Sequence, residues 1–260
     1  EQPIVLSEDL KSIQDELNAV RENAVHNSML AKEAEQRKND LIVYLAHDLK
    51  TPLTSVIGYL TLLEDEPDIP KKTREKYTSI ALNKAERLED LINEFFDITR
   101  FNLTNIELDI EKVNLSRMLE QICSEFLPIL SEHKLSWNLD IAPDINLMCD
   151  PDKLSRVFDN LIRNAVNYSY PDTEITCVLT KQDKDIHILF KNHGKTISPE
   201  KLSRVFEQFF RLDSSRASST GGAGLGLAIA KEIVELHGGQ INAASENESI
   251  SFEVVFRNDL

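Results

Sequence analysis

Residues 219–239 read STGGAGLGLAIAKEIVELHGG, a glycine-rich loop that runs directly into an apolar helical pattern. Gly222, Gly224 and Gly226 leave the backbone free to approach an anion and to adopt positive φ. The helix that follows presents unpaired N–H groups and the positive end of its dipole, which together favour phosphate. The GK[ST] ending of a Walker loop is absent, and no strand leads directly into the glycines. The stretch therefore predicts a phosphate site of another kind, and glycines kept only for flexibility at a helix entry are the alternative.

The sequence around this stretch mixes strand-like and helix-like segments. Alternating apolar and polar residues predict strands at 106–113, 134–142, 145–150, 173–181, 185–192 and 250–256. Helical patterns predict helices at 115–132, 151–168 and 225–237, the second with Asp150 as N-cap and Pro151 at its first position. Because strands and helices do not alternate regularly, we expect an α/β sandwich with helices on one face of a sheet.

The N-terminal part of the chain carries helical patterns only. Apolar residues at steps of three and four from Leu6 to Ala24 are typical of a coiled-coil seam. The pattern continues to Leu63, stops at a polar loop over 64–70, and resumes in an apolar stripe from Tyr77 to Ile98. Two amphipathic helices joined by a short loop form an antiparallel hairpin, and two hairpins bury both stripes in a four-helix bundle. We therefore expect a homodimer.

Composition narrows the class of function. The chain has 44 Asp and Glu against 29 Lys and Arg, and this net charge of -15 argues against a nucleic-acid-binding surface. Cys123, Cys149 and Cys177 are odd in number and lack the spacing of a zinc site or a disulfide framework. No apolar run approaches the roughly 18 residues that cross a bilayer. We expect attachment to a membrane only through a missing N-terminal part.

Residues 159–169, DNLIRNAVNYS, carry polar side chains that suit a metal–phosphate ligand. Asn160 and Asn164 lie one helical turn apart on one face, and Asn167 extends the strip. Amide oxygens can bind Mg²⁺, and amide N–H groups can donate to phosphate oxygens. A polar helix face that only meets solvent is the alternative interpretation.

Residues 45–59, LAHDLKTPLTSVIGY, place a histidine and a proline inside a helical pattern. Proline in a helix interior costs about 3 kcal/mol, so this turn is unusual. His47 lies beside Asp48, and Thr51 follows one turn later on the face of His47. Pro52 lacks the N–H that would bond the carbonyl of Asp48, which loosens the helix at this turn.

Four motifs in order resemble those of the sensor histidine kinases of two-component signalling, and the resemblance covers almost the whole chain. LAHDLKTPLTSVIGY is similar to the H-box, DNLIRNAVNYS to the N-box, FEQFFR at 206–211 to the F-box, and GGAGLGLAI at 221–229 to the second glycine box. The resemblance implies a multidomain α and α/β protein. It has a coiled-coil or signalling helix over 1–38 and a helical-hairpin dimerisation and histidine phosphotransfer domain over 39–104, which forms a four-helix bundle in the dimer. A Bergerat-type (GHKL) α/β-sandwich ATPase domain follows over 105–260.

The resemblance also implies roles for single residues. His47 matches the phosphoacceptor, whose imidazole attacks the γ-phosphorus of ATP. Asp48 matches the neighbour that hydrogen-bonds the imidazole and acts as base, and Thr51 matches the residue that orients a water against the phosphorylated partner. ATP and Mg²⁺ are the implied cofactors, with Asn164 on the metal and Asn160 supporting the metal or the phosphates. The other implied nucleotide contacts are Asn167, Tyr168, Asn192, Gly194, Arg211, Gly222, Gly224, Leu225 and Gly226.

Residues 191–198, KNHGKTIS, depart from the family's first glycine box. Asn192 stands where the family normally has an aspartate that accepts a hydrogen bond from adenine, and Thr196 stands in the place of the second glycine. An amide oxygen still accepts that bond but without charge assistance, so we expect weaker affinity or relaxed base selectivity. At Asn167 many members of the family carry a lysine or arginine instead, so the role of Asn167 is open.

The function that the resemblance implies is an ATP-dependent protein-histidine kinase. It would autophosphorylate His47, pass the phosphoryl group to an aspartate on the receiver domain of a response regulator, and also dephosphorylate that regulator. The resemblance implies the cytoplasmic portion of a bacterial cell-membrane protein. Two alternatives stay open: an ATPase of the gyrase or chaperone type that does not need His47, and a scaffold that binds a regulator without chemistry.

Overall fold

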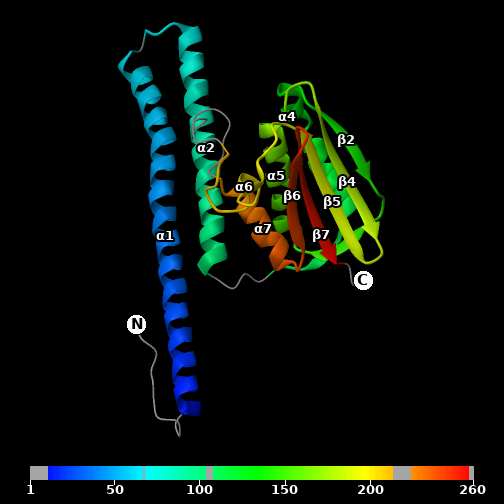
Figure 1. The fold of residues 1–260 in the computed structure, drawn as a ribbon. Coiled ribbons are helices and arrows are strands. Elements are labelled where there is room, and N and C mark those ends of the chain that lie inside the picture. The colour runs from blue at the N-terminus through cyan, green and yellow to red at the C-terminus, as the bar shows by residue number, and fades with distance from the viewer. Residues whose placement is uncertain (1–10, 67, 104–107, 213–223, 258–260) are drawn as a thin grey trace. The chain divides into compact units, whose positions relative to one another are not determined.

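The computed structural model describes residues 11–66, 68–103, 108–212 and 224–257, with some side chains in the first two helices excepted (Figure 1). The chain divides into two compact units, Glu1–Leu88 and Glu89–Leu260, and each is described by itself. Within the described residues, no helix is both long enough and apolar enough to span a bilayer.

The first unit is the predicted helical hairpin. Helix α1 runs over Lys11–Asp65, and α2 runs over Lys71–Leu103, with its first part in this unit (Figure 1). The carbonyl oxygen of Pro70 accepts the N–H groups of Thr73 and Arg74 at 2.8 and 3.0 Å, so the proline lies just before the first turn of α2. Near the loop, the rings of Tyr59 and Tyr77 pack with centroids 5.3 Å apart.

The second unit is the predicted α/β sandwich. Its helices are α3 (Leu115–Glu125), α4 (Leu127–Glu132), α5 (Pro151–Tyr168), α6 (Pro199–Leu202) and α7 (Gly226–Leu236). Its strands are β1 (Glu111–Asn114), β2 (Ser136–Ile141), β3 (Asn146–Cys149), β4 (Glu174–Gln182), β5 (Asp185–His193), β6 (Gln240–Glu246) and β7 (Ser249–Arg257). Over the described residues, β2-β4-β5-β7-β6 form one sheet and β1-β3 a small second one. The β2–β4 pair is parallel, and the other pairs of the large sheet are antiparallel.

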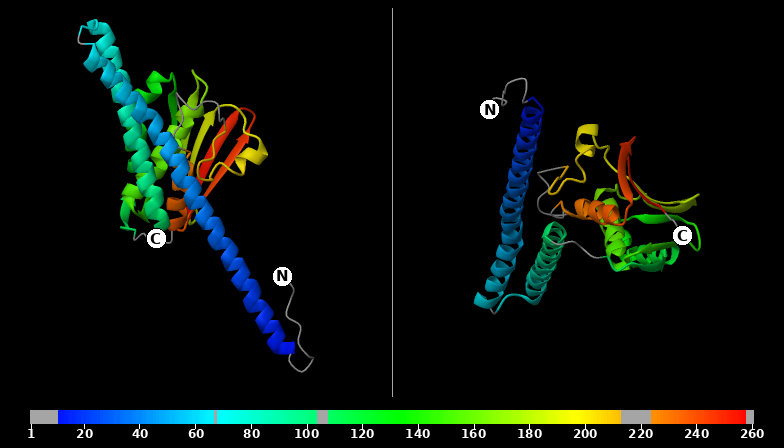
Figure 2. Two further views of the ribbon diagram at one scale, coloured as in Figure 1. Left: turned by 90° about the vertical axis from the view of Figure 1, so that its left-hand side faces the viewer. Right: turned by 90° about the horizontal axis from the view of Figure 1, so that it is seen from below.

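Alternation along the strands gives the large sheet one buried face. In β4, β5 and β7, every second side chain is buried, including Cys177, Phe190 and Phe252. Helix α5 packs on β5 and α7 packs on β6, and the two helices contact each other (Figures 1 and 2). Both helices therefore lie together on the large sheet.

A buried polar cluster fixes the start of α5. The carboxylate of Asp150 accepts the N–H groups of Lys153 and Asp109 at 3.0 and 3.2 Å. Burial raises the pKa of this carboxyl, but the two N–H donors together with the nearby Lys153 and His237 side chains outweigh burial, and the pKa is lowered. The N–H of Asp150 donates to Nε2 of His237 at 3.0 Å, while His237 Nδ1 lies 2.8 Å from the carbonyl oxygen of Ile233. These two bonds require the neutral imidazole with its proton on Nδ1.

Two predicted elements differ in the structure, and one strand was not predicted. The helix predicted at 115–132 breaks at Phe126 into α3 and α4, because Pro128 cannot supply an N–H inside a helix and restricts the residue before it. The strand predicted at 106–113 is shorter and begins at Glu111. Strand β6 was missed, since its sequence QINAASE contains small residues and little apolar alternation, and its place depends on pairing with β7.

Candidate functional site

The polar strip of α5 meets the first turn of α7. A Cβ at Gly226 would lie 2.9 Å from Oδ1 of Asn160, so the amide of Asn160 packs directly against the glycine that opens α7. The Asn160 Nδ2 atom is buried and has no partner. Asn164, half-buried, follows one turn later on the same helix. A buried amide without a partner beside a helix N-terminus has both a donor and a favourable field for an anionic ligand.

The end of β5 supplies a second buried amide. Asn192 is 1% exposed, and its Nδ2 atom also has no partner. A Cβ at Gly194 would overlap the carbonyl oxygen of Tyr168, so only glycine lets β5 end against the last turn of α5. Asn160 and Asn192 are the two side chains with buried, unpartnered nitrogen or oxygen atoms in the described part of the chain.

Thr196 has a structural role that its sequence position did not reveal. Its Oγ1 accepts the N–H of Glu248 at 2.9 Å, and the Glu248 carbonyl accepts the N–H of Gly194 at 2.9 Å. The N–H of Ile197 donates to Oγ of Ser245 at 2.9 Å. These hydrogen bonds hold the segment 194–197 against the end of β6 and the turn that follows it. The Thr196 hydroxyl makes one of them, at the position where the resemblance led us to expect a glycine. No local pattern signals it, because the bonded residues are 52 positions apart.

The F-box and the second glycine box meet through their backbones. The N–H of Phe209 donates to the carbonyl oxygen of Gly224 at 3.0 Å. Phe209 has φ 64° and Gly224 has φ 75°, and a Cβ at Gly224 would lie 3.0 Å from the Phe210 carbonyl oxygen. Gly224 is therefore required for both its conformation and its contact. Leu225 beside it is fully buried, which anchors the start of α7.

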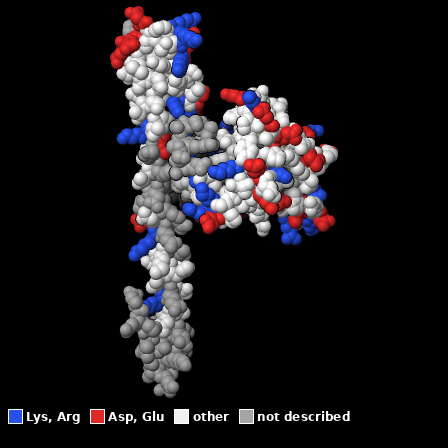
Figure 3. Space-filling model, turned by 45° about the horizontal axis from the view of Figure 1, so that its top comes forward, with Lys and Arg blue, Asp and Glu red and all other residues white. Residues whose placement is uncertain are grey.

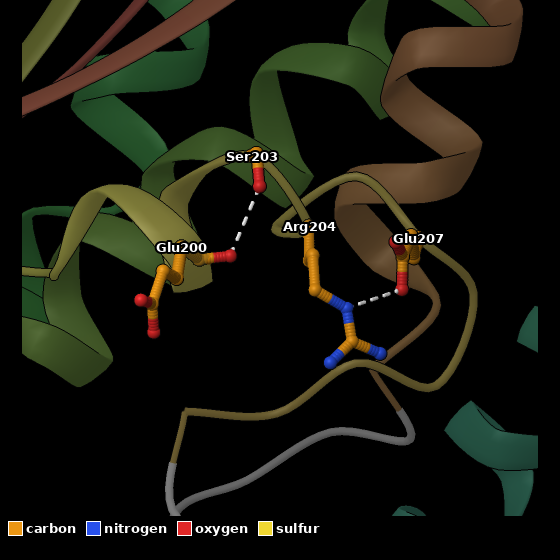
Figure 4. A network of polar contacts seen from close by, with 4 residues as sticks. All are labelled: Glu200, Ser203, Arg204 and Glu207. Carbon is orange, nitrogen blue, oxygen red and sulfur yellow. Dashed lines mark hydrogen bonds and ion pairs between the residues drawn. The ribbon is translucent and has the colours of Figure 1, made fainter.

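Polar contacts in α6 and in the turn after it stabilise the backbone that leads into the F-box (Figure 4). Nε of Arg204 bonds Glu207 at 2.9 Å, and its guanidinium lies 4.7 Å from the centroid of the Phe210 ring. The Ser203 hydroxyl donates to the carbonyl oxygen of Glu200 at 2.9 Å. Arg211, the arginine predicted from the resemblance, is half-buried. Arg204 was not predicted, although its spacing of three residues from Glu207 was the available signal.

The motif that resembles the H-box, at 45–59, lies in the first unit, on α1. His47 and Asp48 are adjacent on one helix and Thr51 follows one turn after His47, with Asp48 half-buried and Thr51 exposed. The side chain of His47, like the whole of Gly222, lies outside the described residues. Pro52 is buried inside α1, which continues as helix to Asp65.

Two side-chain hydroxyl groups donate hydrogen bonds to backbone carbonyl oxygens near Pro52. Thr54 Oγ1 donates to the Lys50 carbonyl oxygen at 2.8 Å, and Ser55 Oγ donates to the Thr51 carbonyl oxygen at 3.1 Å. Such bonds add to the disturbance of the helix at this turn.

The nucleotide-site residues of the sequence analysis lie in the second unit. Asn160 of α5 packs against Gly226 at the start of α7, and the Tyr168 carbonyl at the end of α5 meets Gly194, two residues after Asn192 of β5. Asn167 and Tyr168 are exposed at the end of α5, where the Tyr168 carbonyl touches Gly194. On the face drawn in Figure 3, acidic and basic side chains of this unit are interspersed and do not gather into one basic patch.

Known proteins share this arrangement. The model of the His Kinase A (phospho-acceptor) domain matches residues 37–103, and the model of the histidine kinase-, DNA gyrase B- and HSP90-like ATPase matches residues 149–259. The chain is 57% identical over 251 residues to the sensor protein VanSC of Enterococcus gallinarum, which covers 96% of the chain and 69% of VanSC. The chain belongs to the sensor histidine kinases. Its class of enzyme is accordingly protein-histidine kinase.

Further matches support this membership. This histidine kinase is 47% identical over 251 residues to the sensor protein VanS of Enterococcus faecium, across 96% of the chain and 65% of VanS. Residues 206–239 predict this narrower likeness to VanS, which the two relatives confirm. The crystal structure of histidine kinase ThkA in complex with response regulator protein TrrA matches with a TM-score of 0.65 at 20% identity, over 98% of the chain and 68% of ThkA. At that identity, the likeness to ThkA concerns the fold.

Replacing Gly194 with alanine is expected to destabilise the second unit by about 1–3 kcal/mol, because the new Cβ would overlap the Tyr168 carbonyl oxygen, which is backbone. Gly58→Ala in α1 is the matched control, since a Cβ there meets nothing within 4 Å. Alanine at this helical position should stabilise α1 by about 1 kcal/mol. Denaturant unfolding followed by circular dichroism measures both changes. Equal effects of the two substitutions would contradict the close approach at Gly194.

Proposed function

We propose that this histidine kinase uses ATP and Mg²⁺ to phosphorylate its own His47, and that it passes the phosphoryl group to an aspartate on the receiver domain of a response regulator. The observation that carries the proposal is the buried, unpartnered amide of Asn160 against the first turn of α7. That pairing joins the N-box to the second glycine box and suits a metal-bound triphosphate.

Residues of the second unit suit such a ligand. Asn164 would bind Mg²⁺ through its amide oxygen, with Asn160 supporting the metal or the phosphates, and bound Mg²⁺ would supply neutralisation of phosphate charge. The backbone N–H groups at Gly222, Gly224, Leu225 and Gly226 would donate to phosphate oxygens, and Arg211 would add a positive charge. Asn192 and Gly194 would face the base, with Asn167 and Tyr168 at the rim of the site. The unpartnered Nδ2 atoms of Asn160 and Asn192 support this assignment.

On α1, each residue of the phosphotransfer turn has a separate task. Nε2 of His47 would accept the phosphoryl group, while Asp48 would hold the proton on Nδ1 and so fix the tautomer. Thr51, exposed on the next turn, would orient a water for dephosphorylation of the regulator. ThkA was crystallised with its response regulator, which supports a receiver domain as the partner here.

Exposed apolar side chains on the first unit support a homodimer. Ile57 and Leu60 on α1 and Leu82 on α2 are 56%, 52% and 57% exposed. Two copies of the hairpin would cover these side chains in a four-helix bundle. We assign residues 1–38 to a coiled-coil signalling helix, 39–104 to the dimerisation and phosphotransfer domain, and 105–260 to the ATP-binding catalytic domain.

The biological setting follows from the relatives. The chain spans 69% of VanSC and 65% of VanS, both sensor proteins. We therefore propose that it is the cytoplasmic portion of a bacterial cell-membrane sensor, and that its signalling serves resistance to glycopeptide antibiotics.

Incubation with Mg-ATP labelled at the γ-phosphate tests the proposal. Label that is stable in alkali and lost in acid is expected on the chain, because a phosphoramidate bond to imidazole has that stability. Absence of label from folded protein that binds nucleotide would exclude autophosphorylation and leave the ATPase or the scaffold.

Replacing Pro52 with alanine is expected to shift the ratio of kinase to phosphatase activity, because a continuous hydrogen-bond ladder would stiffen the turn that carries His47. Alanine restores a backbone N–H at position 52 inside α1, so α1 should also gain stability by about 3 kcal/mol. Autophosphorylation and dephosphorylation of the regulator are measured separately. Unchanged rates for both reactions in a stabilised variant would contradict a role of the proline in partner exchange.

A further inference from the structure

The side-chain amide of Asn192 is buried, and backbone groups next to it already have hydrogen-bond partners. The side chain is 1% exposed and its Nδ2 atom has no partner. The neighbouring backbone is engaged: the His193 carbonyl accepts the N–H of Tyr170 at 2.8 Å, and the N–H of Gly194 donates to the Glu248 carbonyl at 2.9 Å. An unpaired buried polar group costs free energy, so a bound molecule is the natural source of the missing hydrogen bond.

We propose that this nucleotide site accepts 6-oxopurine nucleotides, such as inosine and guanosine nucleotides, as well as adenine nucleotides. The inference rests on the proposed function, which sets Asn192 against the purine base. It deepens that function because it names the class of base that the site takes.

The chemistry lies in the two ends of a carboxamide. Adenine presents an amino donor at C6, and Oδ1 of Asn192 can accept a hydrogen bond from it. Hypoxanthine and guanine present an oxygen acceptor, O6, at the same position of the ring. A half-turn about the last side-chain torsion of Asn192 exchanges Oδ1 and Nδ2, so that Nδ2 donates to O6.

A carboxylate at this position cannot make the exchange. Both of its oxygens only accept, so an aspartate pairs with the C6 amino group of adenine and opposes the O6 atom of a 6-oxopurine. A site whose buried polar groups are left unpaired discriminates strongly between such analogues. Asn192 removes this means of rejecting a 6-oxopurine.

The fixed backbone around Asn192 makes the side chain the adjustable part. Strand β5 pairs with β7 up to His193, opposite Ser249, and the Thr196 hydroxyl ties the next residues to Glu248 at 2.9 Å. The backbone at Asn192 is thereby held on both sides. The last torsion of an asparagine side chain is broad and roughly two-fold, so either base can be met without moving the strand.

Isothermal titration of the full 260-residue chain with Mg-ADP and with Mg-IDP tests the proposal. The two differ only at C6 and in the proton on N1. In the wild type, the two dissociation constants are expected to lie within about tenfold of each other. In Asn192→Asp, ADP should bind at least as tightly as in the wild type, while binding of IDP relative to ADP should weaken by about tenfold or more.

Asn138→Asp is the matched control, since it adds the same charge at an exposed position on β2 and should leave the ratio of the two constants unchanged. Tight ADP binding with IDP more than about a hundredfold weaker in the wild type would overturn this inference and leave the proposed function standing. The same ratio in Asn192→Asp as in the wild type would also overturn it. Failure of both nucleotides to bind would overturn both proposals, and the wild-type comparison decides even where Asn192→Asp does not fold.

Discussion

Replacing His47 with glutamine is expected to lower phosphorylation of the chain by about a thousandfold or more, because the amide has no nucleophilic ring nitrogen. His26→Gln is the matched control: it changes the same residue type on the same helix, at an exposed position before the H-box, and should keep full labelling. Labelling with γ-labelled Mg-ATP is measured for both variants and the wild type. Nucleotide affinity should not change in His47→Gln, since the residues assigned to the nucleotide lie in the second unit.

The outcomes of this experiment separate the competing functions. Label that persists in His47→Gln would place the phosphoryl group elsewhere and contradict the role of His47. ATP hydrolysis without any phosphorylated protein, in the wild type as well, would indicate an ATPase of the gyrase or chaperone type. Binding of a regulator with neither hydrolysis nor label would indicate a scaffold.

Replacing Asn164 with alanine is expected to weaken Mg²⁺-dependent nucleotide binding by about a hundredfold, because it removes the proposed direct metal ligand. The affinity for ADP is measured with Mg²⁺ and with a chelator in its place, and the weaker binding without metal should change little. Asn138→Ala, at an exposed position on β2, is the control for loss of an amide. An equal loss with and without Mg²⁺ would show that Asn164 supports the fold or the nucleotide and not the metal.

The sequence predicted best those elements whose signals are local. Helix α5 begins and ends where expected, because Asp150 and Pro151 mark its start and its apolar face is regular. The alternating strands β4, β5 and β7 were predicted for the same reason, since alternation matches burial on one face. Strand β6 escaped prediction because its place depends on pairing with β7.

The sequence predicted the separate motifs of the candidate site, whereas the contacts between these motifs became visible only in the folded structure. The N-box and the second glycine box were each recognised, but the packing of Asn160 on Gly226 joins residues far apart in sequence. From the sequence alone, Thr196 was interpreted only as the replacement of a glycine, although its hydroxyl accepts a hydrogen bond from the turn between β6 and β7. Such contacts carry no local periodicity, so only the assembled sheet and helices reveal them.

Mapping the phosphoryl group on the intact chain tests the central claim most directly. The protein is incubated with Mg-ATP, digested at neutral or alkaline pH to preserve phosphoramidates, and its peptides are sequenced by mass spectrometry. The account predicts a single added phosphoryl group on His47, within the peptide that carries LAHDLKTPLT. A phosphoryl group on any other residue, or none on a protein that binds and turns over ATP, would contradict it.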